Sequence, residues 1–221
     1  MSASITIDVF SDFVCPWCFI GGVRLEQALA GMADEVTAEV TYHPFFLDPT
    51  VPTEGISIPQ MLRQKYGVDP KQLWSRVEAA ARESGITLDL SLQPTMYRTA
   101  RAHTLVRHAE AKGTQLALAA ALFRAYFQDA ANITDPDVLA GIAEQHGFTR
   151  SEALELIGSE AELELSSEAA ISAAQGGIRG VPFFVFDGNL AVSGAQSVSV
   201  LQAAIRQAVA QAGTSEPPLA V

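Results

Sequence analysis

The chain has 221 residues, of which 48% are hydrophobic and 18% charged, so it can bury a substantial core without disulfide support. Its formal net charge of −11 disfavours nucleic acid and anionic membrane surfaces as partners, because both are negatively charged. No apolar run reaches the roughly 18 residues of a membrane span, and the N-terminal residues lack the basic and apolar regions of a signal peptide. We therefore expect a cytoplasmic protein with reduced thiols.

The N-terminal segment predicts a strand, a helix and a second strand. Apolar and polar residues alternate over residues 5–9, which is typical of a half-buried strand. A helical pattern covers residues 19–32, and Pro16 suits the first turn of this helix because its missing N–H costs nothing there. Residues 35–45 then predict the second strand.

Residues 49–159 predict a block of helices. The block begins with a proline-rich stretch that is typical of a linker, and helical patterns dominate after it. Two of the expected helices start with an Asp-Pro pair, at Asp69 and Asp135, and each is followed by a glycine. Thr149 and Glu152 have the spacing of a capping box, in which each side chain accepts a hydrogen bond from the other residue's backbone.

The C-terminal part predicts a long helix, a β-hairpin and a terminal helix. The hairpin turn lies at Asp187–Gly188, between two short apolar runs. The order βαβ, helical block, α–ββ–α predicts one discontinuous α/β domain made of residues 1–48 and 160–214. Residues 49–159 would form an inserted domain, which we expect to lie as a lid over the segment around Cys15.

The only two cysteines lie in the motif "CPWC", with Pro16 and Trp17 between Cys15 and Cys18. A structural staple would stabilise little, because it closes a very short loop. A zinc site needs four ligands, and the sequence has no second CxxC and no histidine pair four residues apart. A redox couple fits better. Cys15 would lie at the N-terminus of a helix, whose dipole and free N–H groups stabilise a thiolate, and Cys18 would resolve mixed disulfides one turn later.

A second motif, "GVPFFVF", contains Val181 and Pro182 at the start of an apolar strand. The residue before a proline is restricted to extended conformations, and a cis bond at this position costs little. Such a turn would bring the Val181 backbone beside Cys15. The alternative is an ordinary proline at the beginning of a strand.

Four stretches resemble the DsbA-like thioredoxin superfamily, and within it the FrnE-type cytosolic thiol oxidoreductases: "SDFVCPWCFIGG", "LFRAYF", "GIRGVPFFVF" and "AVSGAQ". The resemblance implies a fold of the α/β class, a thioredoxin fold with an inserted all-helical domain. It also implies that Cys15 attacks, Cys18 resolves and Pro182 is a cis-proline facing the cysteines. No tightly bound cofactor or metal is expected, and glutathione is a candidate co-substrate.

Other positions have two interpretations each. Asp8 is either a buried acid that moves protons for Cys18 or an exposed strand residue. Arg98 either binds a carboxylate or stabilises a thiolate near the cleft, or it is a solvated helix residue. His103 is either a cleft residue or a buried, hydrogen-bonded helix residue. Trp17 replaces the histidine of strongly oxidising periplasmic relatives and carries no charge, so we expect a less oxidising couple.

Three functions compete at this point. The first is a thiol–disulfide oxidoreductase or isomerase that acts on protein or small-molecule disulfides. The second is a glutathione-dependent isomerase or transferase, of the 2-hydroxychromene-2-carboxylate isomerase or kappa class, although these enzymes typically have a serine at the position of Cys15. The third is a client-binding chaperone with an incidental CxxC. For each we expect a monomer or a homodimer.

Overall fold

The fold is described by a computed structural model that covers residues 2–212. The predicted domain end at residue 214 and the C-terminal tail lie outside the described residues. In chain order, the elements are β1 (Ala3–Ser11), α1 (Pro16–Ala30), β2 (Val36–Pro44), β3 (Ile56–Ser57), α2 (Ile58–Tyr66), α3 (Pro70–Glu83), β4 (Thr95–Met96), α4 (Ala100–Ala109), α5 (Gln115–Phe127), α6 (Pro136–Glu144), α7 (Arg150–Gly158), α8 (Glu160–Gln175), β5 (Phe183–Phe186), β6 (Leu190–Ser193) and α9 (Val198–Ala212).

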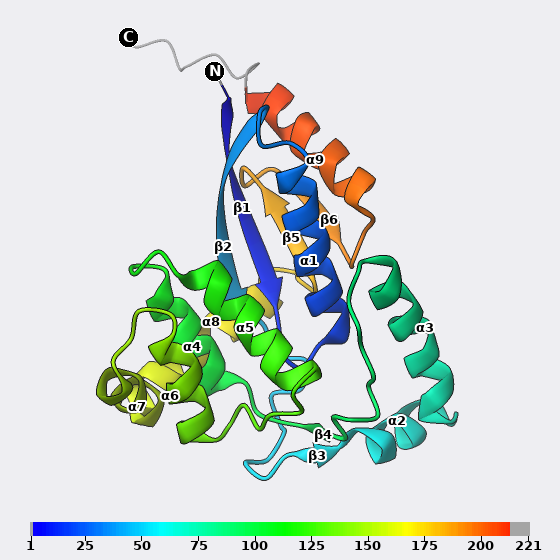
Figure 1. Ribbon diagram of the computed structural model, residues 1–221, viewed down its shortest axis with the longest axis vertical. Coiled ribbons are helices and arrows are strands. Elements are labelled where there is room, and N and C mark those ends of the chain that lie inside the picture. Colours follow the sequence, from blue (N-terminus) through cyan, green and yellow to red (C-terminus); the bar gives the residue numbers. More distant parts are fainter. Residues whose placement is uncertain (1, 213–221) are drawn as a thin grey trace.

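The central sheet has the strand order β2-β1-β5-β6. β1 pairs parallel with β2 and antiparallel with β5, and β5 and β6 form the predicted hairpin. Asp187 and Gly188 both have positive φ angles, 48° and 65°, which suits the tight turn between twisted strands. Figure 1 shows α1 and α9 lying side by side along this sheet. The fold is therefore a thioredoxin fold whose βαβ and ββα parts are separated in the sequence.

A side chain pairs with the backbone of Tyr42 on the edge strand β2. The amide oxygen of the buried Gln115 accepts a hydrogen bond from the Tyr42 backbone N–H at 2.8 Å, and its amide nitrogen donates to the Tyr42 carbonyl at 3.4 Å. Gln115 thus supplies the donor and the acceptor that a neighbouring strand would supply. This contact also joins the first turn of α5 to the sheet.

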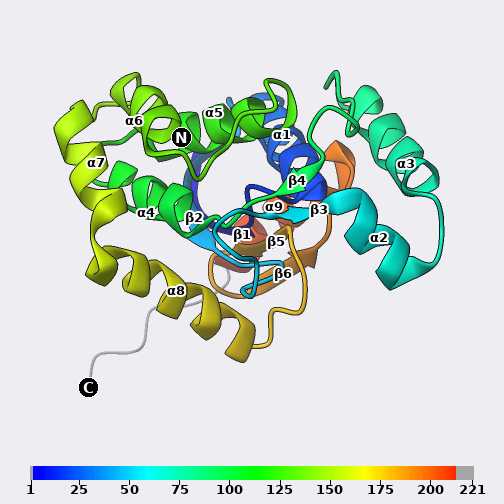
Figure 2. The ribbon, with the colours of Figure 1, turned by 90° about the horizontal axis from the view of Figure 1, so that it is seen from below.

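The inserted segment is mostly helical, and it is arranged as two groups rather than as one lid. Figure 2 shows α2 and α3 on one side of the sheet and α4–α7 on the other. A short antiparallel ribbon, β3 with β4, lies between the groups. The ribbon was not expected, because strands of two residues are too short to produce an alternating pattern. The domain limits at residues 48–49 and 159–160 stay a prediction.

The helix starts follow the predicted capping chemistry. Asp69 and Asp135 accept hydrogen bonds from backbone N–H groups of the first turn, each followed by a proline at the first helical position. Thr149 and Glu152 form the complete capping box. Among residues 2–212 no helix combines the length and the hydrophobicity that crossing a membrane requires.

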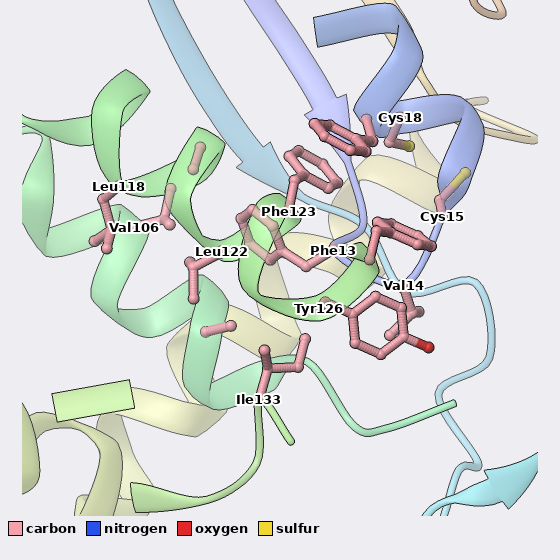
Figure 3. Close-up of a cluster of buried hydrophobic side chains, with 14 of the residues drawn as sticks. Phe13, Val14, Cys15, Cys18, Val106, Leu118, Leu122, Phe123, Tyr126 and Ile133 are labelled. Atoms are coloured by element: carbon pink, nitrogen blue, oxygen red, sulfur yellow. The ribbon is translucent and has the colours of Figure 1, made fainter. Parts of the chain in front are cut away.

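The described residues form two hydrophobic cores. One core lies between the sheet, α1 and α9, and its fully buried members include Ile7, Phe184 and Leu201. The other core belongs to the insert and extends to α1, where it includes Cys15 and Cys18. The cysteine pair therefore lies on the face of α1 that the insert covers (Figure 3).

Candidate active site

Cys15 is the residue that begins α1. Its backbone is extended, with φ −94° and ψ 111°, and Pro16 follows as the first helical residue. Its thiol lies 3.7 Å from the Val181 carbonyl oxygen and donates a weak hydrogen bond to it. The side chain is 4% exposed. Cys15 therefore lies both at the N-terminus of a helix and beside the loop before β5, as the sequence predicted.

Cys18 lies one turn further along α1 and is 1% exposed. Its backbone N–H donates to the Cys15 carbonyl at 3.0 Å. Burial raises the pKa of the Cys18 thiol well above its ordinary value, and the hydrogen bond and charge of Cys15 raise it further. The Asp12 backbone and the Ser11 hydroxyl act in the opposite direction and lower this pKa. Both thiols are free, and Cys18 is neutral at neutral pH.

The loop before β5 packs directly on α1. The Val181–Pro182 peptide bond is cis, as the resemblance implied. Pro182 is buried, and its carbonyl oxygen accepts a hydrogen bond from the Gly194 N–H at 2.8 Å. A Cβ atom on Gly21 would lie 2.8 Å from Pro182 Cγ, so only glycine permits this close approach of helix and loop. The contact fixes the position of the Val181 carbonyl beside Cys15.

A cavity of about 630 Å³ opens beside Cys15. Four predicted site residues meet on its wall, namely Cys15, Pro16, Trp17 and Val181. The rest of the wall comes mainly from α2 and α3, with Met96 of the ribbon and residues of the connecting loops, while Phe127 is the one residue of α4–α7 that lines it in the described chain. The predicted lid is thus formed by only one group of the inserted helices.

Asp8 does not approach the cysteines as a buried acid. Its carboxylate is 37% exposed and lies 2.6 Å from Nε2 of His43, on the neighbouring strand. Strand geometry explains this position, because Asp8 points to the opposite side of the sheet from the buried Ile7 and Val9. The interpretation of Asp8 as an exposed strand residue fits the structure, and its interpretation as a buried proton carrier does not.

The buried acid near the cysteines is Asp12, which the sequence analysis did not single out. Asp12 is 2% exposed, and its Oδ2 accepts a hydrogen bond from the Leu47 N–H at 2.8 Å. Its Oδ1 lies 3.6 Å from Nε2 of His103, and neither atom has a hydrogen-bond partner among the described residues. The position of Asp12 three residues before Cys15, in the loop that precedes the helix, could have marked it.

His103 and Arg98 lie near Asp12 but away from the large cavity. His103 is buried between the rings of Phe13 and Phe46, at centroid distances of 4.6 and 5.7 Å. Arg98 is exposed and lines a separate, water-sized cavity of about 20 Å³, which Asp12 also lines. The structure thus separates these two residues from the wall around Cys15. In residues 2–212 no three His, Cys, Asp or Glu side chains converge as a metal site requires.

Comparisons with known proteins agree with this architecture. A probable DsbA oxidoreductase from Streptomyces coelicolor, SCO1869, has a similar structure, with a TM-score of 0.85, 30% identity and coverage of 98% of this chain and 94% of that one. 2-Hydroxychromene-2-carboxylate isomerase aligns with a TM-score of 0.72 and 18% identity over 96% of this chain and 100% of that one. The cytosolic disulfide reductase DsbM from Pseudomonas aeruginosa, solved with glutathione, aligns with a TM-score of 0.63 and 18% identity over 95% and 98%.

The last two similarities show a shared fold, and the family follows from the sequence. The family model of the DSBA-like thioredoxin domain matches residues 6–206. This match runs from β1 into α9 and so includes both parts of the thioredoxin fold together with the inserted helices. The chain therefore belongs to the DSBA-like thioredoxin domain family.

Proposed function

We propose that this protein is a thiol–disulfide oxidoreductase of the FrnE type that exchanges disulfides with protein or small-molecule thiols through Cys15 and Cys18. The observation that carries the proposal is the position of the Cys15 sulfur. It lies at the N-terminus of α1, on the wall of a cavity and 3.7 Å from the Val181 carbonyl oxygen. A helix N-terminus favours the anionic form of a sulfur placed there, and the cavity gives a disulfide access to it.

The exchange has two steps. The Cys15 thiolate attacks one sulfur of a substrate disulfide, a Cys15–substrate disulfide forms, and the other substrate sulfur leaves as a thiolate. Cys18 then loses its proton to solvent and attacks the Cys15 sulfur, so that the second substrate thiolate leaves and a Cys15–Cys18 disulfide remains. One substrate disulfide is reduced to two thiols, and the cysteine pair is oxidised. The reverse sequence oxidises substrate thiols, and partial reversal isomerises disulfides.

A similar protein supports a proposal for the compartment and the co-substrate of this reaction. DsbM is a cytosolic disulfide reductase whose structure was solved with glutathione. We therefore infer a cytoplasmic site of action, no tightly bound cofactor and glutathione as a co-substrate that recycles the cysteine pair. The active unit is a monomer or a homodimer.

Variants of the two cysteines test the proposal. The wild-type protein should reduce insulin in a glutathione-coupled assay, and Cys15→Ser should abolish this activity. Cys18→Ser should retain the first step and accumulate mixed disulfides, which appear as slower bands on non-reducing gels. Activity that survives in Cys15→Ser would overturn the proposal.

A glutathione-dependent isomerase is the second candidate, and the similarity to 2-hydroxychromene-2-carboxylate isomerase favours it. Such an activity forms no disulfide between Cys15 and Cys18. It would therefore persist in Cys18→Ser, whereas net disulfide reduction would be lost. A chaperone would suppress aggregation of unfolded clients equally well in the wild type and in the Cys15→Ser/Cys18→Ser variant.

A further inference from the structure

The cavity beside Cys15 has an apolar wall that extends far beyond the reactive sulfur. Side chains from α2 and α3 form this wall, among them Ile58, Met61, Leu73, Trp74 and Val77. The volume of about 630 Å³ lies within the range of roughly 300–1,000 Å³ that is typical of small-molecule sites. A small polar disulfide would leave most of this wall uncovered, so the wall favours a substrate with a bulky apolar group.

Three charged side chains line the cavity, and together they carry one surplus positive charge. Asp48 already accepts two hydrogen bonds from Thr50, at 2.9 and 2.6 Å, and these bonds hold the pKa of its carboxyl below the ordinary value. Lys65 lies 5.4 Å from the ring centroid of Tyr66, and its charge also favours the ionised form of Asp48. In a chain of net charge −11, this local excess of cations is unusual.

Arg76 is the charged residue without a partner. Within the described part of the chain, its guanidinium makes no hydrogen bond, ion pair or ring contact, although it lies on the cavity wall. A guanidinium offers several N–H donors in a planar arrangement that matches a carboxylate. The wall therefore combines an apolar surface, a free carboxylate-binding group and a reactive sulfur.

We propose that this cavity binds small disulfides in which one half is an aromatic or similarly bulky apolar group bearing a carboxylate. The inference rests on the proposed function, because Cys15 supplies the exchange chemistry. The carboxylate binds Arg76, the apolar group covers Trp74 and Met61, and the substrate sulfur meets Cys15. Attack by Cys15 and release of the second half then follow the two steps described above.

Four disulfides distinguish this proposal from simple thiol reactivity. They are the aromatic dianion 5,5′-dithiobis(2-nitrobenzoate), the neutral aromatic 4,4′-dithiodipyridine, oxidised glutathione and bis(2-hydroxyethyl) disulfide. Each stopped-flow rate with the reduced full-length protein is divided by the rate of free 2-mercaptoethanol with the same compound at the same pH, which removes differences in leaving group. The net charge of −11 alone would slow the two dianions, the aromatic one and oxidised glutathione, relative to the two neutral disulfides. Cavity binding instead predicts that the aromatic dianion reacts fastest, so the two effects predict opposite rankings for it.

The expected normalised rate is highest for the aromatic dianion, about tenfold or more above bis(2-hydroxyethyl) disulfide, and it should saturate with concentration as a bound complex does. Replacing Arg76 by Gln should lower the dianion rate about 1.5- to fivefold, the range for one exposed ion pair, and leave the neutral aromatic rate unchanged. Arg82→Gln is the matched control, because Arg82 is exposed on the same helix and is not part of the cavity wall.

A binding measurement without disulfide chemistry completes the test. The sulfur-free acid 2-nitrobenzoate should protect Cys15 from iodoacetamide, 2-nitrobenzyl alcohol should protect it less, and Arg76→Gln should remove the difference. Equal normalised rates for all four disulfides, or a highest rate for oxidised glutathione, would overturn the inference and leave the oxidoreductase intact. Failure of the wild-type protein to react with any disulfide would instead overturn the proposed function.

Discussion

Burial is the main reason why the pKa of Cys18 lies well above its ordinary value, and Cys15 adds to the shift. Once Cys15 is held in a mixed disulfide, its thiol no longer contributes, but burial still does. Cys18 must therefore lose a proton from an environment that disfavours the thiolate. The second step of the exchange therefore depends on pH.

We predict that release of substrate from a Cys15 mixed disulfide accelerates as the pH rises. A raised pKa leaves little thiolate at neutral pH, so the rate should increase about tenfold per pH unit while the pH stays below the pKa of Cys18. The measurement is the appearance of the released aromatic thiolate after the first equivalent has been formed. Cys18→Ser is the control and should release none, and a rate that stays constant from neutral pH upward would contradict the prediction.

Ser11 should tune this second step. Its hydroxyl favours the Cys18 thiolate and lowers the pKa of Cys18. The side chain is 1% exposed, and its oxygen has no hydrogen-bond partner within the described chain, so it is free to donate to that thiolate once it forms. Ser11→Ala should therefore slow the release step at neutral pH about three- to tenfold, the net worth of one typical hydrogen bond. The first step and the urea midpoint should change little, and equal slowing of both steps would point to a packing defect instead.

At the scale of elements, the approach of α1 to the cis-proline loop depends on one glycine. A methyl group on Gly21 would lie 2.8 Å from Pro182 Cγ and 3.3 Å from the Phe184 ring. Gly21→Ala should lower the free energy of unfolding by about 1–3 kcal/mol and reduce the exchange rate, because the loop must move away from Cys15. Urea unfolding and insulin reduction measure the two effects.

Gly141 provides the matched control for this substitution. It lies in helix α6 with nothing within 4 Å of an added Cβ, so Gly141→Ala should be neutral or should stabilise by about 0.4–1 kcal/mol. If Gly21→Ala exchanged disulfides at the wild-type rate, the loop would tolerate displacement. In that case the Val181 carbonyl is not held by the contact between α1 and Pro182.

Local sequence signals predicted most helices and strands. The site residues that they missed depend on contacts between distant parts of the chain. Asp69, Asp135 and the Thr149–Glu152 box marked helix starts correctly, because capping depends on neighbours within one turn. Asp8 had two interpretations and Asp12 was not considered, because burial depends on which strand face and which loop the insert covers. The cavity residue Arg76 was not marked, since its role requires α3 to lie beside α1.

At the scale of the whole molecule, the two hydrophobic cores have different relations to the cysteines. Phe123 of α5 stacks on Phe19 of α1 at a centroid distance of 5.6 Å and lies 5.0 Å from Phe13. Leu201 of α9 is equally buried, but it belongs to the core of the sheet. The insert thus supports the active-site helix directly, although it is remote in the sequence.

We predict that the two cores affect Cys18 differently. Phe123→Ala and Leu201→Ala should each destabilise the protein, by about 3–5 and 2–5 kcal/mol, because both empty a buried site. Under native conditions, iodoacetamide should label Cys18 faster in Phe123→Ala than in Leu201→Ala, since only the former loosens the wall behind the cysteines. Mass spectrometry of the labelled protein checks this, and equal labelling in variants of similar stability would contradict it.

The amide of Gln115 on the backbone of Tyr42 has a consequence for self-association. An exposed edge strand is a template on which further copies can add strands and polymerise. Gln115 occupies this template at Tyr42, so a strand that pairs with this part of β2 would first have to displace it. The opposite edge is the four-residue strand β6, which offers a much shorter template. Aggregation seeded by the folded state is therefore disfavoured at both ends of the sheet.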